Sequence, residues 1–225
     1  MSPFLLFHPT FSVLTRFTVQ CSVWPGFFTQ GAIWPQQGEI DIIENVNLAT
    51  SNQYALHVGY SPCNQPSTGV NQTGKPNGLN CTVEPLLKIN TAGCVVVESQ
   101  PNSFGQGFAN NNGGVYAMLW DEDGVAIWFF PRQSIPSDIS ASGNTPNPSG
   151  WGTPSAFYPA SGCNPTAAFG PQIITFVRLS LSRSYADRFM VVHRHLRSIR
   201  GSNQRLPINL RQCCSQLLIS RCRPA

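Results

Sequence analysis

Two apolar runs joined by an acidic turn constrain the fold of this chain most. Residues 115–120 are Val-Tyr-Ala-Met-Leu-Trp, and residues 125–130 are Val-Ala-Ile-Trp-Phe-Phe. Both runs are rich in aromatic and β-branched residues, and the Asp-Glu-Asp-Gly segment at 121–124 favours a tight turn. Residues 114–130 are therefore predicted to form a β-hairpin. The acidic turn lacks the later glutamate that a calcium-binding loop needs, so a solvated turn is expected.

Composition extends this prediction to the whole chain. The 225 residues include 19 glycines and 19 prolines, and asparagine and serine are also frequent. Such a sequence favours short strands separated by turns and excludes a helical bundle. Further strands are predicted at residues 39–46, 53–59 and 172–177, so the expected fold class is all-β. The region 60–112 is expected to form disulfide-tied loops instead of regular structure.

An abrupt change in charge divides the chain after Phe176. Before this point four cations stand against nine acids, whereas after it there are ten arginines and one aspartate. All five tryptophans and every glycine except Gly201 precede the boundary. We therefore expect an unassigned segment at 1–20, one domain at 21–176 and an Arg-rich tail of unknown structure at 177–225.

The Arg-rich tail has two interpretations. Ten arginines generate a salt-sensitive positive field that attracts nucleic acid or an anionic membrane. No base-reading motif accompanies this charge, and no apolar run reaches the roughly 18 residues that span a bilayer. A disordered tail is therefore the favoured interpretation, with no specific nucleic-acid partner and no membrane span.

Eight cysteines and two glycosylation sequons bear on compartment and metal binding. None of the cysteine and histidine spacings matches a zinc site, so no metal and no cofactor are expected. The cysteines, together with Asn-Gln-Thr at Asn71 and Asn-Cys-Thr at Asn80, predict an oxidising secretory route and an extracellular location. Residues 1–17 have neither a basic start nor a long apolar run, so they make a poor signal peptide. The sequence leaves the pairing of the cysteines open.

Three acids lie within the segment Gly-Glu-Ile-Asp-Ile-Ile-Glu at 38–44. Its β-branched residues predict a strand, in which Glu39 and Asp41 share one face because side chains alternate with a period of two. Glu44 would face the opposite way unless an extra residue forms a bulge, which the doubled isoleucine at 42–43 can supply. With the bulge, Glu44 returns to the face of Glu39, about 13 Å away between Cα atoms at ~3.3 Å per residue.

Carboxyl groups on one face of a strand suit glycoside hydrolysis once their side chains lean together. The retaining reaction uses two carboxyl groups about 5 to 5.5 Å apart. One attacks the anomeric carbon, and the other protonates the departing oxygen. An ionised neighbour raises the pKa of an acid, so a row of three carboxyls can hold one protonated near neutral pH. The alternative is an exposed edge strand with solvated acids, and the spacing alone does not decide between the two.

The Glu-Ile-Asp-Ile-Ile-Glu segment at 39–44 resembles the active-site motif of glycoside hydrolase family 16 in its bulged form. Stretches on both sides resemble the fungal laminarinase-type endo-β-1,3(4)-glucanases of that family, at residues 24–28, 34–35, 56–57, 115–132 and 151–154. The resemblance covers residues 21–176 and implies a β-sandwich jelly roll of the concanavalin A-like type. It also implies that Glu39 is the nucleophile, Glu44 the acid/base, and Asp41 a helper that tunes the nucleophile.

The same resemblance adds three substrate-binding candidates. Trp24 and Trp34 resemble aromatic residues that stack on glucose rings, and His57 resembles a histidine beside the carboxyl groups. From the sequence alone each tryptophan equally suits the core, and His57 equally suits a hydrogen-bonded core position. Phe28 stands where the family commonly has tryptophan, so that sugar contact is not carried over. The remaining tryptophans are expected in the core or the cleft wall: Trp120, Trp128 and Trp151.

The resemblance implies an endo-acting hydrolase of β-1,3- or mixed β-1,3/1,4-glucans that works by retaining double displacement, with β-glucan as its partner. The alternative is a non-catalytic glycan-binding remnant of the same fold. Family strands expected before Cys21 and after Phe176 have no counterpart in the sequence. We therefore expect an incomplete sandwich in a chain truncated or altered at both ends. The missing parts include a Cys-Gly-Asp-Trp stretch, which implies that Cys163 lacks its usual partner.

Overall fold

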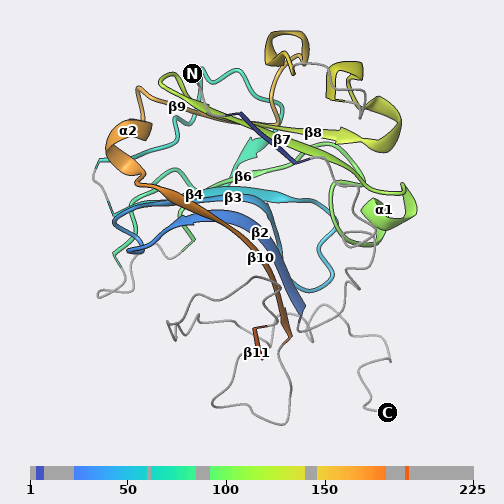
Figure 1. The fold of residues 1–225 in the computed structure, drawn as a ribbon, viewed down its shortest axis with the longest axis horizontal. Coiled ribbons are helices and arrows are strands. Elements are labelled where there is room, and N and C mark those ends of the chain that lie inside the picture. The colour runs from blue at the N-terminus through green and yellow to red at the C-terminus, as the bar shows by residue number, and fades with distance from the viewer. Residues whose placement is uncertain are drawn as a thin grey trace.

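The fold is a sandwich of two antiparallel β-sheets, as the two layers of Figure 1 show. The computed structural model describes residues 4–7, 23–59, 62–84, 92–139, 146–180 and 191–192. Two short helices, α1 (Gly105–Asn110) and α2 (Pro165–Ala168), lie at opposite ends of the sandwich. The predicted all-β sandwich is thus confirmed.

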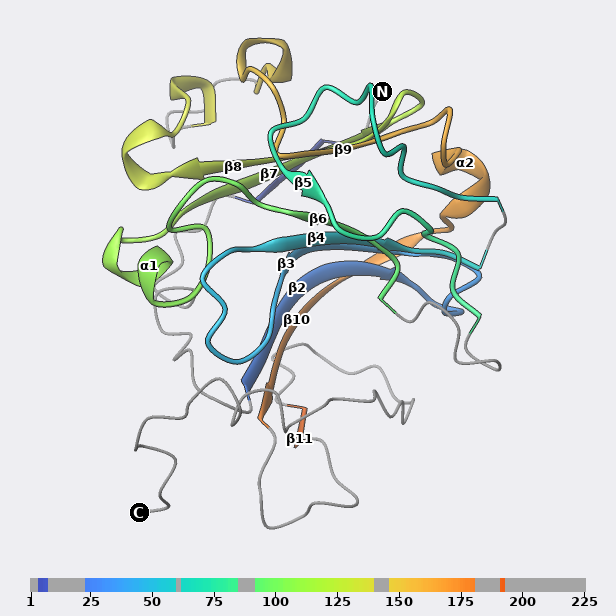
Figure 2. The same cartoon turned by 180° about the vertical axis from the view of Figure 1, so that it is seen from behind.

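Four strands form one sheet and seven form the other. In spatial order, the four-stranded sheet contains β1 (Phe4–Phe7), β7 (Gly114–Asp121), β8 (Gly124–Pro131) and β9 (Ala156–Pro159). The order in the seven-stranded sheet is β11 (Val191–Val192), β10 (Gln172–Ser180), β2 (Val23–Gly31), β3 (Glu39–Glu44), β4 (Gln53–His57), β6 (Cys94–Val97) and β5 (Lys75–Pro76). The larger sheet arches, and the Val23 end of β2 and the Ser180 end of β10 bend away from the smaller sheet (Figure 2).

Strands β7 and β8 form the predicted hairpin. Their register runs from Gly114 opposite Pro131 to Asp121 opposite Gly124. Gly124 has a φ of +144°, and a Cβ atom at this position would lie 2.2 Å from the carbonyl oxygen of Tyr158 on β9. A side chain would therefore clash with the neighbouring strand, which explains the glycine at the end of the turn.

The main hydrophobic core lies between the sheets. Ile40 contributes to it from the larger sheet and Tyr116 from the smaller one, and both are almost fully buried. Trp120 packs against this core while remaining partly exposed. A second cluster belongs to β7, β8 and the segments beside them, where the rings of Trp128 and Trp151 pack edge to face with centroids 5.3 Å apart. The prediction that these three tryptophans serve the core or its margin is confirmed.

The predicted strand ends differ from the observed ones by a few residues. Strand β3 ends at Glu44 rather than at 46, and Asn47 in the following turn has a φ of +59°. Strand β10 continues to Ser180, since its whole length pairs with β2. The change in composition at Phe176 therefore falls inside a strand.

The region predicted as disulfide-tied loops contains regular structure as well. A disulfide joins Cys81 to Cys94, as expected for a tied loop. However, residues Cys94–Val97 form strand β6, which pairs with β4, and Gly105–Asn110 form α1. A loop-only prediction is therefore wrong there, because four residues of Cys-Val-Val-Val are too short to show a strand period.

Cys163 has a disulfide partner within the described residues. It forms a disulfide with Cys63, across a sequence separation of 100 residues and a Cα–Cα distance of 4.3 Å. The Asn64 N–H donates to the Gly162 carbonyl at 2.9 Å, so the two loops meet through their backbones next to the bridge.

Several sequence predictions fall outside the described residues. These are the unassigned start of the chain with Cys21, the last three cysteines, and the Arg-rich tail beyond Ser180 apart from β11. Within the ranges given above, no helix is both long enough and apolar enough to cross a membrane.

Candidate active site

A bulge in β3 brings the three acids to one face of the larger sheet. Asp41 lies opposite Ala55 on β4, but the next pair is Glu44 opposite Gln53, so β3 has one extra residue between these pairs. The pairing with β2 shifts at the same place. Ile42 is fully buried in the core, so the acids on either side of the doubled isoleucine face away from it. The predicted bulge is confirmed.

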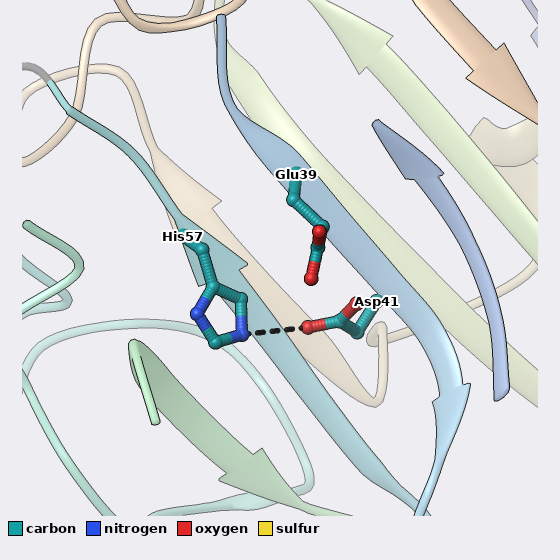
Figure 3. A group of neighbouring side chains, drawn as sticks. All are labelled: Glu39, Asp41 and His57. Carbon is teal, nitrogen blue, oxygen red and sulfur yellow. Dashed lines mark ion pairs between the residues drawn. The ribbon is translucent and has the colours of Figure 1, made fainter. Parts of the chain in front are cut away.

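The side chains of Glu39, Asp41 and His57 converge beside the bulge (Figure 3). Glu39 on β3 lies directly opposite His57 on β4. The His57 Nε2 is 2.9 Å from the Asp41 Oδ2, at ion-pair distance but without hydrogen-bond geometry. One ligand atom from each of the three residues lies within 4.8 Å of the others, close enough to hold one metal ion. Asp41 is only 1% exposed, so water contributes little to its solvation.

Loss of solvation raises the pKa of all three carboxyl groups. It is the largest cause in each case, and it brings the pKa of Asp41 to about 7 and that of Glu44 to about 8. The pKa of Glu39 also lies well above its usual value, first because of burial and then because of the Asp41 charge beside it. The Asp41 charge raises the pKa of Glu44 as well. The cluster therefore retains protons near neutral pH, where isolated carboxyl groups are ionised.

Strand β2 supplies a hydrogen-bond donor to each of the outer acids. The indole Nε1 of Trp24 donates to Glu44 Oε1 at 2.6 Å. The amide Nε2 of Gln30 donates to Glu39 Oε2 at 2.9 Å. Both donors favour the ionised form of the carboxyl group they contact, and the Trp24 bond lowers the pKa of Glu44 against the larger effect of burial.

The other predicted aromatic residues take different positions. The ring of Trp34 lies 6.5 Å from that of His57 between centroids, and its buried Nε1 has no hydrogen-bond partner within the described part of the chain. Trp34 and Trp24 are both half-buried, so neither is a core residue. Phe28 is also half-buried and pairs with Asp41 across β2 and β3. The structure thus brings all six predicted residues to three adjoining strands, β2, β3 and β4, and the β2–β3 connection.

Two further residues contact the acids, and no sequence pattern predicted either of them. Gln30 lies directly opposite Glu39 in the antiparallel pairing of β2 and β3, so a correct register would have pointed to it. Asn52 hydrogen-bonds the backbone of the bulge, and its side chain is fully buried. No pattern in the sequence distinguishes this asparagine from the others in its loop.

Comparison with known proteins identifies the family. A family model for the XgeA-like catalytic GH16 domain matches residues 13–198. The match covers most of the 225 residues. The chain therefore belongs to glycoside hydrolase family 16, within its XgeA-like group.

The relatives of this chain include fungal endo-1,3(4)-β-glucanases. The chain is 41% identical over 145 residues to an endo-1,3(4)-β-glucanase of Arthroderma benhamiae, covering 64% of this chain and 31% of that one. It is 42% identical over 144 residues to the endo-1,3(4)-β-glucanase xgeA of Emericella nidulans, covering 64% and 21%. The chain thus spans about a fifth to a third of the length of these curated relatives.

Solved structures show the same fold. Laminarinase 16A from Phanerochaete chrysosporium, with β-glucans in both donor and acceptor sites, matches with a TM-score of 0.66 at 35% identity, covering 73% of this chain and 55% of that one. An elongating family 16 β-1,3-glucosyltransferase matches with a TM-score of 0.61 at 37% identity, covering 72% and 51%.

Proposed function

We propose that this chain is an endo-acting hydrolase of β-1,3- or mixed β-1,3/1,4-glucans that retains the anomeric configuration. The observation that carries the proposal is the bulged register of β3, which places Glu44 on the same face as Glu39 and Asp41. The endo-1,3(4)-β-glucanase names of the fungal relatives support this substrate class. Trp24 and Trp34 border the acids and suit stacking on the apolar faces of glucose rings, and the Trp34 N–H can donate to a sugar hydroxyl.

The reaction needs two carboxyl groups in opposite protonation states. In the first step a Glu39 oxygen attacks the anomeric carbon, the glycosidic C–O bond breaks, and Glu44 gives its proton to the departing oxygen. In the second step Glu44 takes a proton from water, the hydroxide attacks the anomeric carbon, and Glu39 leaves as a carboxylate. Because each displacement inverts the carbon, the two together retain its configuration. The pKa of about 8 suits Glu44 to hold the required proton at neutral pH.

The charge on the nucleophile depends on the interaction between Glu39 and Asp41. Burial raises the pKa of both carboxyl groups, and the two interact strongly enough to titrate as a pair. The contact between the two carboxyl groups raises the pKa of Glu39 and lowers that of Asp41, whereas Gln30 Nε2 donates to Glu39 Oε2 and favours the ionised form of Glu39. Asp41 thereby tunes the nucleophile.

The direct test is sugar release by the full chain. We expect reducing ends to appear from laminarin and from mixed-linkage β-glucan, with an early fall in viscosity that marks internal cleavage. Circular dichroism of the same sample establishes that the protein is folded. Binding to insoluble glucan by a folded sample that releases no sugar would replace the hydrolase with a glycan-binding protein.

A Trp24→Phe variant tests the role of Glu44 through pH. The substitution keeps an aromatic ring but removes the donor that lowers the pKa of Glu44, so this pKa should rise further. Because Glu44 must be protonated to act as the acid, the alkaline limb of kcat/KM should move to higher pH. We expect a loss of less than about tenfold in kcat/KM at pH 6. Trp34→Phe is the control, because the Trp34 indole does not donate to Glu44. An equal shift of the alkaline limb of kcat/KM in Trp34→Phe would contradict the prediction.

We also propose an extracellular location, with a glycan on Asn71 and none on Asn80. Asn71 is exposed. The Asn80 side-chain oxygen instead accepts from the Thr82 N–H at 2.9 Å, and the intervening Cys81 is fully buried in its disulfide. Expression in a secreting yeast, followed by enzymatic deglycosylation and peptide mass spectrometry, should convert Asn71 alone to aspartate. In Asn71→Gln the protein should lose the whole mass of the glycan. Higher glycan occupancy at Asn80 than at Asn71 would contradict the assignment.

A further inference from the structure

The bulge in β3 interrupts the hydrogen-bond ladder with β4. Between the pairs Asp41–Ala55 and Glu44–Gln53, two residues of β3 face a single residue of β4. A bulge of this kind leaves peptide groups without their usual cross-strand partners, and buried peptide groups need a replacement. The backbone on either side of Ile43 therefore needs hydrogen bonds from another source if Glu44 is to stay in place.

Asn52 supplies both of these hydrogen bonds. Its Oδ1 accepts from the Glu44 N–H at 3.0 Å, and its Nδ2 donates to the Ile42 carbonyl at 2.8 Å. A side-chain amide carries a donor and an acceptor side by side, so it can stand in for a peptide group of a neighbouring strand. Asn52 immediately precedes β4 and is fully buried, so water does not compete for these bonds.

The backbone of Asn52 is itself held on both sides. Its N–H donates to Ser103 Oγ at 3.0 Å, and its carbonyl accepts from the Glu98 N–H at 2.9 Å. The Ser103 carbonyl in turn accepts a hydrogen bond from the Tyr116 hydroxyl on β7 of the opposite sheet. This chain of bonds fixes the Asn52 amide relative to both sheets, so the amide can define where the bulge lies.

We propose that Asn52 is a positioning residue that sets the place of the Glu44 carboxyl group. This inference rests on the proposed role of Glu44 as the acid/base. Asn52 contacts the backbone of Glu44 and not the site of bond cleavage, so it acts through the position of the acid. Glu39 and Asp41 precede the bulge and keep their register when the amide is lost.

The test separates proton donation from the rest of catalysis. A laminarioligosaccharide β-fluoride needs no proton on its leaving group, whereas laminarin does. Asn52→Ala should lower kcat/KM on laminarin by about 10- to 100-fold, the scale expected of a small misplacement. It should lower kcat/KM on the fluoride by less than about threefold, because the nucleophile keeps its place. The kcat/KM of Asn52→Ser on laminarin should lie between those of Asn52→Ala and the unaltered protein, because serine can keep one of the two hydrogen bonds.

Asn45→Ala is the matched control. Asn45 also makes two side-chain hydrogen bonds in the same connection, to the Ser51 carbonyl and the Val46 N–H, but neither reaches Ile42 or Glu44. Its ratio of laminarin to fluoride activity should equal that of the unaltered protein. Equal losses on both substrates in Asn52→Ala and Asn52→Ser would overturn the proposal, since this is the result of a merely structural role.

Hydrogen exchange of the Glu44 amide provides a readout that does not require turnover. In Asn52→Ala this amide should exchange at least about tenfold faster than in Asn45→Ala, because it has lost its acceptor. If the unaltered protein shows no activity, the proposed function is rejected. The exchange measurement then decides alone whether Asn52 holds the Glu44 backbone in place. Unchanged exchange at Glu44 in both Asn52 variants would reject the positioning role.

Discussion

Glu39→Gln is expected to abolish glucan hydrolysis while leaving glucan binding nearly unchanged. Glutamine has the same shape as glutamate but no anionic oxygen to attack the anomeric carbon, so kcat should fall by about 10³- to 10⁵-fold. It keeps the polar contact with Gln30, which holds the position opposite in β2. Sugar release from laminarin measures the first effect, and sedimentation with insoluble glucan measures the second.

The control for this prediction is Glu122→Gln. It makes the same chemical change in the exposed turn of the β7–β8 hairpin, far along the chain from the carboxyl cluster. Its activity should equal that of the unaltered protein. Turnover by Glu39→Gln within about tenfold of this control would reject the nucleophile role.

Loss of folding does not explain the expected loss of activity in Glu39→Gln. The folded-state pKa of Glu39 is raised, so its contribution to stability is present below the pKa of the unfolded chain and declines as pH rises through the folded pKa. Glutamine does not titrate, so the variant does not lose this stability as pH rises. The Tm of Glu39→Gln at pH 8 should therefore equal or exceed that of the unaltered protein in a thermal melt.

Glu44→Ala is expected to produce the second large effect, one that depends on the leaving group. Without the acid, kcat/KM on laminarin should fall by about 10²- to 10⁴-fold, whereas an oligosaccharide fluoride should react in its first step almost as before. Azide enters the space left by the side chain and needs no base, so it should restore turnover and yield a β-glycosyl azide. Mass spectrometry and NMR identify this product and its configuration.

The pH profile completes the assignment of Glu44. The unaltered protein should lose kcat/KM as pH rises through about 8, since the acid loses its proton there. Glu44→Ala acting on the fluoride should show no such alkaline limb. An α-glycosyl azide, or an alkaline limb that persists in the variant, would contradict a retaining mechanism with Glu44 as its acid.

Local patterns in the sequence were enough to predict the hairpin and the bulged strand. The hairpin follows from two apolar runs around Asp-Glu-Asp-Gly, and the bulge follows from the odd spacing of Asp41 and Glu44 around a doubled isoleucine. The hairpin and the bulge both depend on residues close together in the chain, so the two-residue period of a strand is enough to reveal them.

Long-range partners could not be predicted in the same way. The pairing of Cys63 with Cys163 depends on two loops meeting through the Asn64 and Gly162 backbones, and no local pattern encodes this meeting. Gln30 and Asn52 contact the site only because of register and loop placement. Family resemblance supplied residue roles, but it did not point to Cys63 as the partner of Cys163.

The Cys63–Cys163 bridge closes a covalent ring in the middle of the chain. The ring encloses strands β5 to β9, whereas the carboxyl-bearing β3 and its neighbours β2 and β4 precede it and β10 follows it. Closing a loop of this length restricts the unfolded chain by about 4.7 kcal/mol in the chain-entropy model. Within the described residues neither disulfide encloses β2, β3, β4 or β10, so there the acid-bearing strand β3 is attached to the ring through packing and hydrogen bonds. A protein built in this way can lose its carboxyl-bearing face by local opening while β7, β8 and β9 of the four-stranded sheet stay together.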